Sequence, residues 1–304
     1  MRYGNQNFEG QSITYRWTVG EIERLCQCYP VIKKSIIGKS IMGKDIFLLQ
    51  IGRGPRNVFY AGAFHANEGI TAAVLLRFVE EHAQRVVNAR WMYEQITLYV
   101  APLVNPDGVD LVSRALTEGA YYQQAVAIAT QYPEIPFPDG WKANIEGTDL
   151  NLQFPADWEL AKEIKFAMGY YRPAPRDFVG EAPLSAPESR AVYDFVREKS
   201  PSLILAYHTQ GEVIYWKYKD KEPVHSREIA AYFQYVSGYE MEETPFASGN
   251  AGFKDWFILQ FNRPGYTIEA GLGENPLPMS QFDRIYQDNQ GILLGAMIQT
   301  VLLL

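Results

Sequence analysis

The sequence predicts one α/β domain, built on a twisted, mixed and mostly parallel sheet with helices on both faces. Apolar runs of strand length alternate along the chain with segments of helical periodicity. These apolar runs are nearly continuous, which is typical of strands buried on both faces. The 304 residues show no linker rich in proline, glycine or serine and no repeat. We therefore expect residues 1–304 to form a single domain without an accessory domain.

The first half of the chain predicts two strands with a helix between them. Residues 58–64 are an apolar run that fits a buried strand, and residues 69–89 carry apolar side chains at helical spacing. Residues 96–100 predict the next strand, which ends near Pro102. A loop-rich stretch with two or three short helices is then expected from Asn105 to about Pro183.

The second half predicts two further strands and two longer helices. Ser185, Ala186 and Pro187 are typical of a helix start, with a candidate cap and an early proline, and this helix is expected to end near Glu198. The two strands and the last helix follow at residues 203–207, 265–268 and from about 280.

Charge and hydropathy argue against several classes of protein. The formal net charge is -7 without a basic cluster, which argues against a nucleic-acid partner. No apolar run has the length of a membrane span, and residues 1–10 lack the apolar core of a signal peptide. Cys26 and Cys28 cannot build a disulfide framework; they are incidental thiols, or they bind metal or act in redox chemistry. We expect a cytoplasmic protein.

Three residues suited to metal chemistry follow predicted strands. His65, His208 and Glu269 each stand at the end of an apolar run. Sites in open α/β sheets gather at the carboxyl ends of strands. His65 and Glu68 could supply two ligands of a zinc site made of two imidazoles and one carboxylate. Taken singly, each histidine could instead be an ordinary interior residue, and Glu269 could be half of a buried ion pair.

From about Ile22 to the final helix, the chain resembles the zinc carboxypeptidases of the carboxypeptidase A type. Matching residues occur in the order that this family has, and carboxypeptidase A itself binds zinc through two histidines and one glutamate. They are His65, Glu68, Asn105-Pro106-Asp107-Gly108, Gly147-Thr148-Asp149-Leu150-Asn151, His208, Asp255-Trp256 and Glu269.

The resemblance implies a role for each matching residue. One zinc ion would be held by His65, Glu68 and His208. Glu269 would be the general base, and then the acid, for hydrolysis by zinc-activated water. Lys142 matches the arginine that stabilises the oxyanion, although a solvated loop lysine is the alternative. Asp149 matches the carboxylate that orients the first zinc histidine.

The departures from this family concern the substrate's terminal carboxylate. Classical members bind it with an asparagine followed by an arginine, but here Asn151 is followed by Leu152. Asn67 replaces a further arginine, and residues 244–250 lack the usual tyrosine. We expect Asn151 to bind substrate, with Arg263, Lys142 or another cation in place of the missing arginine.

A branch of the family resembles this chain more closely, namely the bacterial γ-D-glutamyl-L-diamino acid peptidases. This resemblance implies cleavage of the bond between γ-linked D-glutamate and meso-diaminopimelate or L-lysine in cell-wall peptides. It implies a soluble muropeptide as substrate, in recycling or in the sporulating cell, since no LysM repeat is evident. The motifs that carry it are Trp141-Lys142-Ala143-Asn144, residues 149–155, His208-Thr209-Gln210-Gly211, Ile214-Tyr215-Trp216 and residues 245–252.

Two rival hypotheses remain at this point. A carboxypeptidase or amidohydrolase of the same fold would cleave ordinary peptides or acylated amino acids. A catalytically silent binding protein would keep the fold, but it would need no base at Glu269. His82 and His225, the other two histidines, are expected to be solvent-exposed and not to bind metal.

Overall fold

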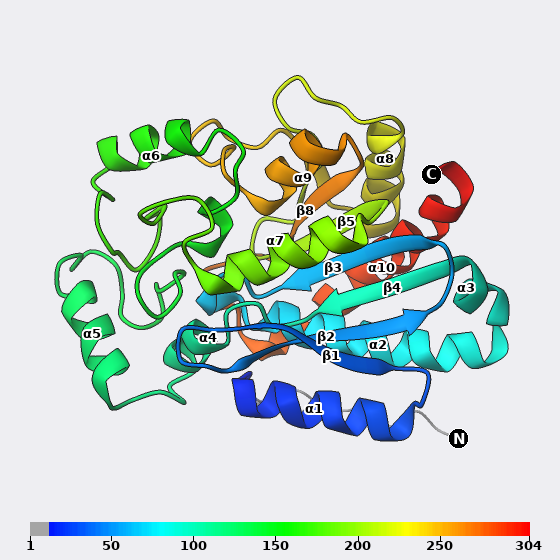
Figure 1. The fold of residues 1–304 in the computed structure, drawn as a ribbon, viewed down its shortest axis with the longest axis horizontal. Helices are drawn as coiled ribbons and strands as arrows, with labels where there is room; N and C mark the ends of the chain where they lie inside the picture. Colours follow the sequence, from blue (N-terminus) through cyan, green and yellow to red (C-terminus); the bar gives the residue numbers. More distant parts are fainter. Residues whose placement is uncertain (1–11) are drawn as a thin grey trace.

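An eight-stranded sheet forms the centre of the computed structural model, which describes residues 12–304 (Figure 1). The strand order is β1-β2-β4-β3-β5-β8-β6-β7. The strands are β1 (Lys33–Lys39), β2 (Asp45–Gly52), β3 (Arg56–Gly62), β4 (Ile96–Ala101), β5 (Leu203–His208), β6 (Val213–Tyr215), β7 (Glu240–Glu242) and β8 (Gly265–Glu269).

The middle of the sheet is parallel and its flanks contain antiparallel pairs. β4, β3, β5 and β8 pair in parallel, as do β6 and β7. The pairs β1–β2, β2–β4 and β6–β8 are antiparallel. The predicted mixed, mostly parallel sheet is therefore confirmed. In this register His208 lies beside Glu269.

Helices cover both faces of the sheet, as predicted. Side chains alternate between the faces along a strand, so Val58 and Tyr60 pack on one side and Phe59 and Ala61 on the other. The first face packs against α1 (Tyr15–Cys28), α2 (Ile70–Asn88), α8 (Ser226–Ser237) and α10 (Phe282–Leu303). The second packs against α7 (Pro187–Lys199) and α9 (Phe253–Phe261), which lie in front of the sheet in Figure 1.

The second face is rich in aromatic side chains. Phe59 contacts Phe195 of α7 and Phe253 of α9, with ring centroids 5.2 and 6.0 Å apart. Each buried ring removes roughly 150–250 Å² from water, so these contacts dominate the packing of α7 and α9. This packing fixes the positions of α7 and α9. The loops beside these helices surround the carboxyl ends of the strands.

The remaining helices are short and lie mainly in the loop-rich stretch that the sequence predicts. They are α3 (Arg90–Gln95), α4 (Pro106–Val112), α5 (Ala120–Ala129), α6 (Trp158–Ala167) and the 3-10 turns η1 (Ala66–Glu68), η2 (Leu150–Leu152) and η3 (Met279–Gln281). Pro187 begins α7 as expected, but Ser185 does not cap it and instead donates to Gln153 Oε1 at 3.1 Å. Across residues 12–304, no helix combines the length and the apolar character needed to cross a membrane.

The prediction that His82 is exposed was wrong. His82 is only 1% exposed, because α2 turns this side chain into the core, where its ring stacks on Phe78. Burial, followed by the charge of Arg85, lowers the pKa of His82 to about 4, so the ring is neutral. His225 is partly exposed and lies 3.0 Å from Glu228.

Candidate metal centre

The carboxyl ends of three parallel strands bring the predicted site residues together. β5 ends at His208 and β8 ends at Glu269. β3 ends at Gly62, and the chain then passes through His65 into η1, which carries Glu68. These strands are neighbours in the sheet, so all four side chains lie at one edge.

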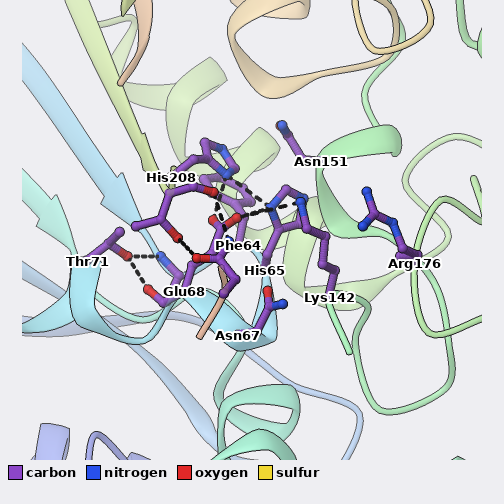
Figure 2. A network of polar contacts seen from close by, with 12 residues as sticks. Phe64, His65, Asn67, Glu68, Thr71, Lys142, Asn151, Arg176 and His208 are labelled. Carbon is purple, nitrogen blue, oxygen red and sulfur yellow. Dashed lines mark hydrogen bonds and ion pairs between the residues drawn. The ribbon is translucent and has the colours of Figure 1, made fainter. Parts of the chain in front are cut away.

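The side chains of His65, Glu68 and His208 converge on one point (Figure 2). His65 Nδ1 lies 2.9 Å from Glu68 Oε1 and 3.2 Å from His208 Nδ1. His208 Nδ1 lies 2.9 Å from Glu68 Oε2. Within residues 12–304, these three form the one group of candidate metal-binding side chains, with ligand atoms within 4.8 Å of one another.

The chemistry of these atoms fits a divalent cation. Asp149 Oδ1 lies 3.2 Å from His65 Nε2, so this nitrogen keeps its proton, and Nδ1 is the nitrogen whose lone pair would face a cation that takes the place of the second ring proton. Two imidazole nitrogens and a carboxylate then face one another. Burial lowers the pKa of His65, but the charges of Glu68 and Asp149 outweigh it and raise the pKa to about 9. The surroundings therefore favour positive charge at this point, and two histidines with one glutamate are ligands suited to zinc.

Both carboxylates around His65 stay ionised. Burial raises the pKa of Glu68, but His65 and His208 lower it by more. Burial likewise raises the pKa of Asp149, and the charge and hydrogen bond of His65 bring it well below its usual value. Two ionised carboxylates therefore flank His65, and their charge would stabilise a bound cation.

Asn105 joins the metal-binding segment to the segment that contains Lys142. Its Nδ2 donates to Phe64 O at 3.1 Å and to Ala143 O at 3.0 Å, while its Oδ1 accepts from Gly108 N at 3.0 Å. A Cβ atom on Gly108 would lie 2.6 Å from Asn105 Oδ1 and 2.7 Å from Ala66 Cβ. The Asn-Pro-Asp-Gly motif therefore serves as a packed support beneath the site.

Lys142 and Glu269 lie beside the three candidate ligands. Lys142 Nζ is 3.9 Å from Glu68 Oε1, and the side chain lines the same pocket as His65. Glu269 also lines this pocket. Burial raises the pKa of Glu269, His208 lowers it, and Glu68 raises it further, with a net increase. A carboxyl group of this kind suits proton transfer near neutral pH.

The pocket encloses about 180 Å³ and extends from the metal-binding side chains to the loops beyond them. Asn151 Oδ1 accepts from Phe253 N at 3.0 Å, and Nδ2 makes no hydrogen bond within the described residues. Leu152, which follows Asn151, also lines the pocket. Thr244, Pro245 and Ser248 form another part of the wall.

The structure corrects the expectation that Arg263 binds substrate. Arg263 precedes β8, six residues before Glu269, which corresponds to about 20 Å along an extended strand. Its Nη1 donates to Ser200 O at 2.6 Å and to Pro201 O at 2.9 Å, just before β5 begins. Arg263 is therefore at the opposite end of the strands from the pocket, which it does not line.

Several charged residues of the pocket were not identified from the sequence. Lys165, Arg176, Asp177 and Lys254 come from α6, the loop after it, and α9. No periodicity or strand end marks them, because long-range packing of loops brings them to the site. Only a sequence motif around each of these residues could have indicated them.

Comparison with known proteins identifies a matching family and two relatives in sequence. The family model for zinc carboxypeptidases matches residues 19–291. The chain is 40% identical to gamma-D-glutamyl-L-diamino acid endopeptidase 1 of Lysinibacillus sphaericus, over 97% of this chain and 73% of that protein. It is 38% identical to the protein YqgT of Bacillus subtilis (strain 168), over 91% of this chain and 75% of that one.

A solved structure with low sequence identity shares the fold. Thrombin activatable fibrinolysis inhibitor superposes with a TM-score of 0.73 at 18% identity, covering 96% of this chain and 75% of that chain. The eight-stranded sheet and the helices on its two faces are therefore an arrangement already known from experiment.

Proposed function

Since the chain belongs to the zinc carboxypeptidase family, we propose that it is a zinc metallopeptidase that cleaves the γ-D-glutamyl bond to meso-diaminopimelate or L-lysine in cell-wall peptides. The observation that carries this proposal is the combination of an intact metal-binding group with Leu152 beside Asn151. The first supports hydrolysis, and the second argues against the carboxylate contact of a classical carboxypeptidase. The 40% identity to gamma-D-glutamyl-L-diamino acid endopeptidase 1 supports the same substrate class.

Each residue of the site has a definite task in this reaction. His65, Glu68 and His208 would hold a zinc ion, which when bound would polarise the scissile carbonyl and make the attacking water more acidic. Glu269 takes a proton from the attacking water and passes it to the leaving amine. Lys142 supplies positive charge where the oxyanion develops, as a single-point cation. Asp149 keeps His65 in the tautomer that presents Nδ1.

One assay tests the proposal against both rivals. The zinc-loaded protein is incubated with L-Ala-γ-D-Glu-meso-diaminopimelate and with the matched α-linked peptide, and the products are identified by mass spectrometry. We expect release of meso-diaminopimelate from the γ-linked peptide only. Cleavage restricted to the α-linked peptide would indicate an ordinary peptidase, and cleavage of neither would indicate a binding protein.

The cellular setting is a further part of this proposal. A cytoplasmic location and a role in muropeptide recycling or in the sporulating cell stay predictions from the sequence. Fractionation of cells that express the protein, followed by detection with an antibody, would test the location.

A further inference from the structure

We propose that Arg176 is the specificity-determining cation that binds a carboxylate of the substrate through Nη1 and Nη2. This inference rests on the proposed function, because the γ-linked substrate carries free carboxylates on both sides of the cleaved bond. Arg176 belongs to the loop between α6 and α7 and lines the pocket together with His65 and Lys142. It would thus replace, from a different segment, the arginine that is absent after Asn151.

The backbone places Arg176 directly beside the metal-binding residues. Lys142 N donates to Pro175 O at 2.7 Å, so the segments that contain Lys142 and Arg176 run next to each other. Asp177 N donates to Asp149 Oδ2 at 3.2 Å, and Asp149 is the residue that orients His65. Figure 2 shows Arg176 and Lys142 on the same side of His65. The neighbours of Arg176 in the chain are therefore hydrogen-bonded to Lys142 and Asp149, which both belong to the proposed site.

The guanidinium group is oriented but its outer edge is unoccupied. Arg176 Nε donates to Asp177 Oδ2 at 2.6 Å, which fixes the plane of the group. Nη1 and Nη2 make no hydrogen bond to any residue between 12 and 304, and the side chain keeps 41% of its exposure. A guanidinium presents two parallel N–H groups along such an edge, which matches the two oxygens of a carboxylate.

Charge favours an anion at this position. Asp177 also accepts from Lys165 Nζ at 2.5 Å, so one carboxylate is shared between two cations. These three side chains carry two positive charges and one negative charge, and the neighbouring Asp149 carboxylate is already engaged by His65 and by the backbone N–H of Asp177. Lys165 is buried, so the excess positive charge is accessible to a ligand through Arg176.

The other cations of the pocket are less suited to this task. Lys254 Nζ is already bonded to Lys217 O at 2.6 Å and Thr244 Oγ1 at 3.3 Å, and it pairs with Asp255 Oδ1 at 2.7 Å. These contacts use its three protons. Lys142 faces Glu68 at 3.9 Å and presents a single point of charge. Arg176 is the forked cation among the described residues that line the pocket.

The test compares charge removal on the protein with charge removal on the substrate. The variants are Arg176→Gln, Arg176→Lys and, as a matched control, Arg172→Gln, which removes an exposed arginine of the same loop that does not line the pocket. The substrates are L-Ala-γ-D-Glu-meso-diaminopimelate and two analogues, with a carboxamide either at the D-glutamyl α-carboxylate or at the α-carboxylate of the diamino acid. If Arg176→Gln no longer lowers kcat/KM for one of these analogues, the carboxylate that is replaced in that analogue is the one that Arg176 binds.

We expect Arg176→Gln to lower kcat/KM for the free carboxylate about 10- to 100-fold, mainly through KM. For one of the two carboxamide analogues, kcat/KM with the unaltered protein should be lowered by the same factor. Arg176→Gln should then cause no further decrease in kcat/KM for that analogue. Arg176→Lys should have an intermediate kcat/KM, because lysine keeps the positive charge but lacks the two parallel N–H groups. Arg172→Gln should have the same kcat/KM as the unaltered protein. Zinc content should be equal in all four proteins. An equal loss on all three substrates, or no loss, would overturn the proposal.

The role of Arg176 can also be tested if the protein does not cleave the γ-linked peptide. If the unaltered protein cleaves only the α-linked peptide, the same comparison is made with that peptide and its carboxamide. If it cleaves neither, calorimetric binding of the γ-linked peptide and its two carboxamides is compared between the unaltered protein and Arg176→Gln. A carboxylate preference that Arg176→Gln abolishes supports the role of Arg176, and its absence refutes it.

Discussion

His65 Nε2 lies 3.2 Å from Asp149 Oδ1, on the opposite side of the imidazole ring from Glu68. This contact determines which nitrogen of His65 keeps its proton and therefore which one can bind a metal. Asp149 is itself fixed, because its Oδ2 accepts the backbone N–H of Asp177. The metal-binding group thus depends on a residue that does not touch the metal position.

Replacement of Asp149 with asparagine should weaken zinc binding about 10- to 100-fold. The amide can still accept from His65, but the negative charge that favours a cation is lost. Competition with a chromophoric chelator measures the affinity. Asp139→Asn serves as a control, since Asp139 pairs with Arg114 at the surface. Equal zinc affinity in the two variants would contradict this role.

Replacement of Glu269 with glutamine should leave zinc affinity unchanged and lower kcat about 10²- to 10⁴-fold. Glutamine has nearly the same shape but cannot take a proton from water. Single-turnover kinetics on the γ-linked peptide, with zinc content measured on the same samples, separates the two effects. Hydrolysis at the normal rate would show that another group is the base.

Glu188 should make the protein less stable as the pH rises. This buried carboxyl accepts from Ile41 N at 3.1 Å and Asn144 Nδ2 at 3.3 Å, and burial is the main cause that raises its pKa from 4.5 to about 7. Because the folded state binds the proton more tightly than the unfolded state does, this stabilisation is present at low pH and is lost as the pH rises through about 7.

The Glu188→Gln variant tests this pH dependence. Glutamine cannot ionise, so the variant should not lose stability through this group as the pH rises. Between pH 5 and pH 8, the free energy of unfolding of the unaltered protein should therefore decrease by about 2 to 3 kcal/mol more than that of the variant. Urea unfolding at both pH values gives the four free energies. Groups that titrate in both proteins cancel in the comparison, and identical pH profiles would refute the prediction.

Replacement of Gly108 with alanine should destabilise the protein by about 1 to 3 kcal/mol, because the new methyl group would overlap Asn105 and Ala66. Zinc affinity should also fall, since Ala66 lies in the turn that carries Glu68. Gly20→Ala is the matched control, because that position lies within α1 and a Cβ atom there meets no atom within 4 Å. Thermal unfolding with and without zinc should separate the two variants.

The central strands and the metal-binding side chains could be predicted from the sequence. Their signals are local: an apolar run predicts β5, and His208 closes it. The sheet flanks were harder, because β1 is largely exposed and β6 and β7 contain three residues each, so none shows a long apolar run. Arg176 could not be identified, and Arg263 was placed wrongly, because the position of a cation in the pocket depends on loop packing.

His65 and His208 are 143 residues apart in the chain, yet His65 follows β3 and His208 ends the adjacent parallel strand β5. Closing so long a loop must precede any contact between them, and non-local parallel pairing is slow. The unfolded chain therefore offers zinc no preformed site, and β3 and β5 must pair before the metal can bind with full affinity. Zinc would then act on the finished fold: it slows unfolding and leaves the rate of folding nearly unchanged.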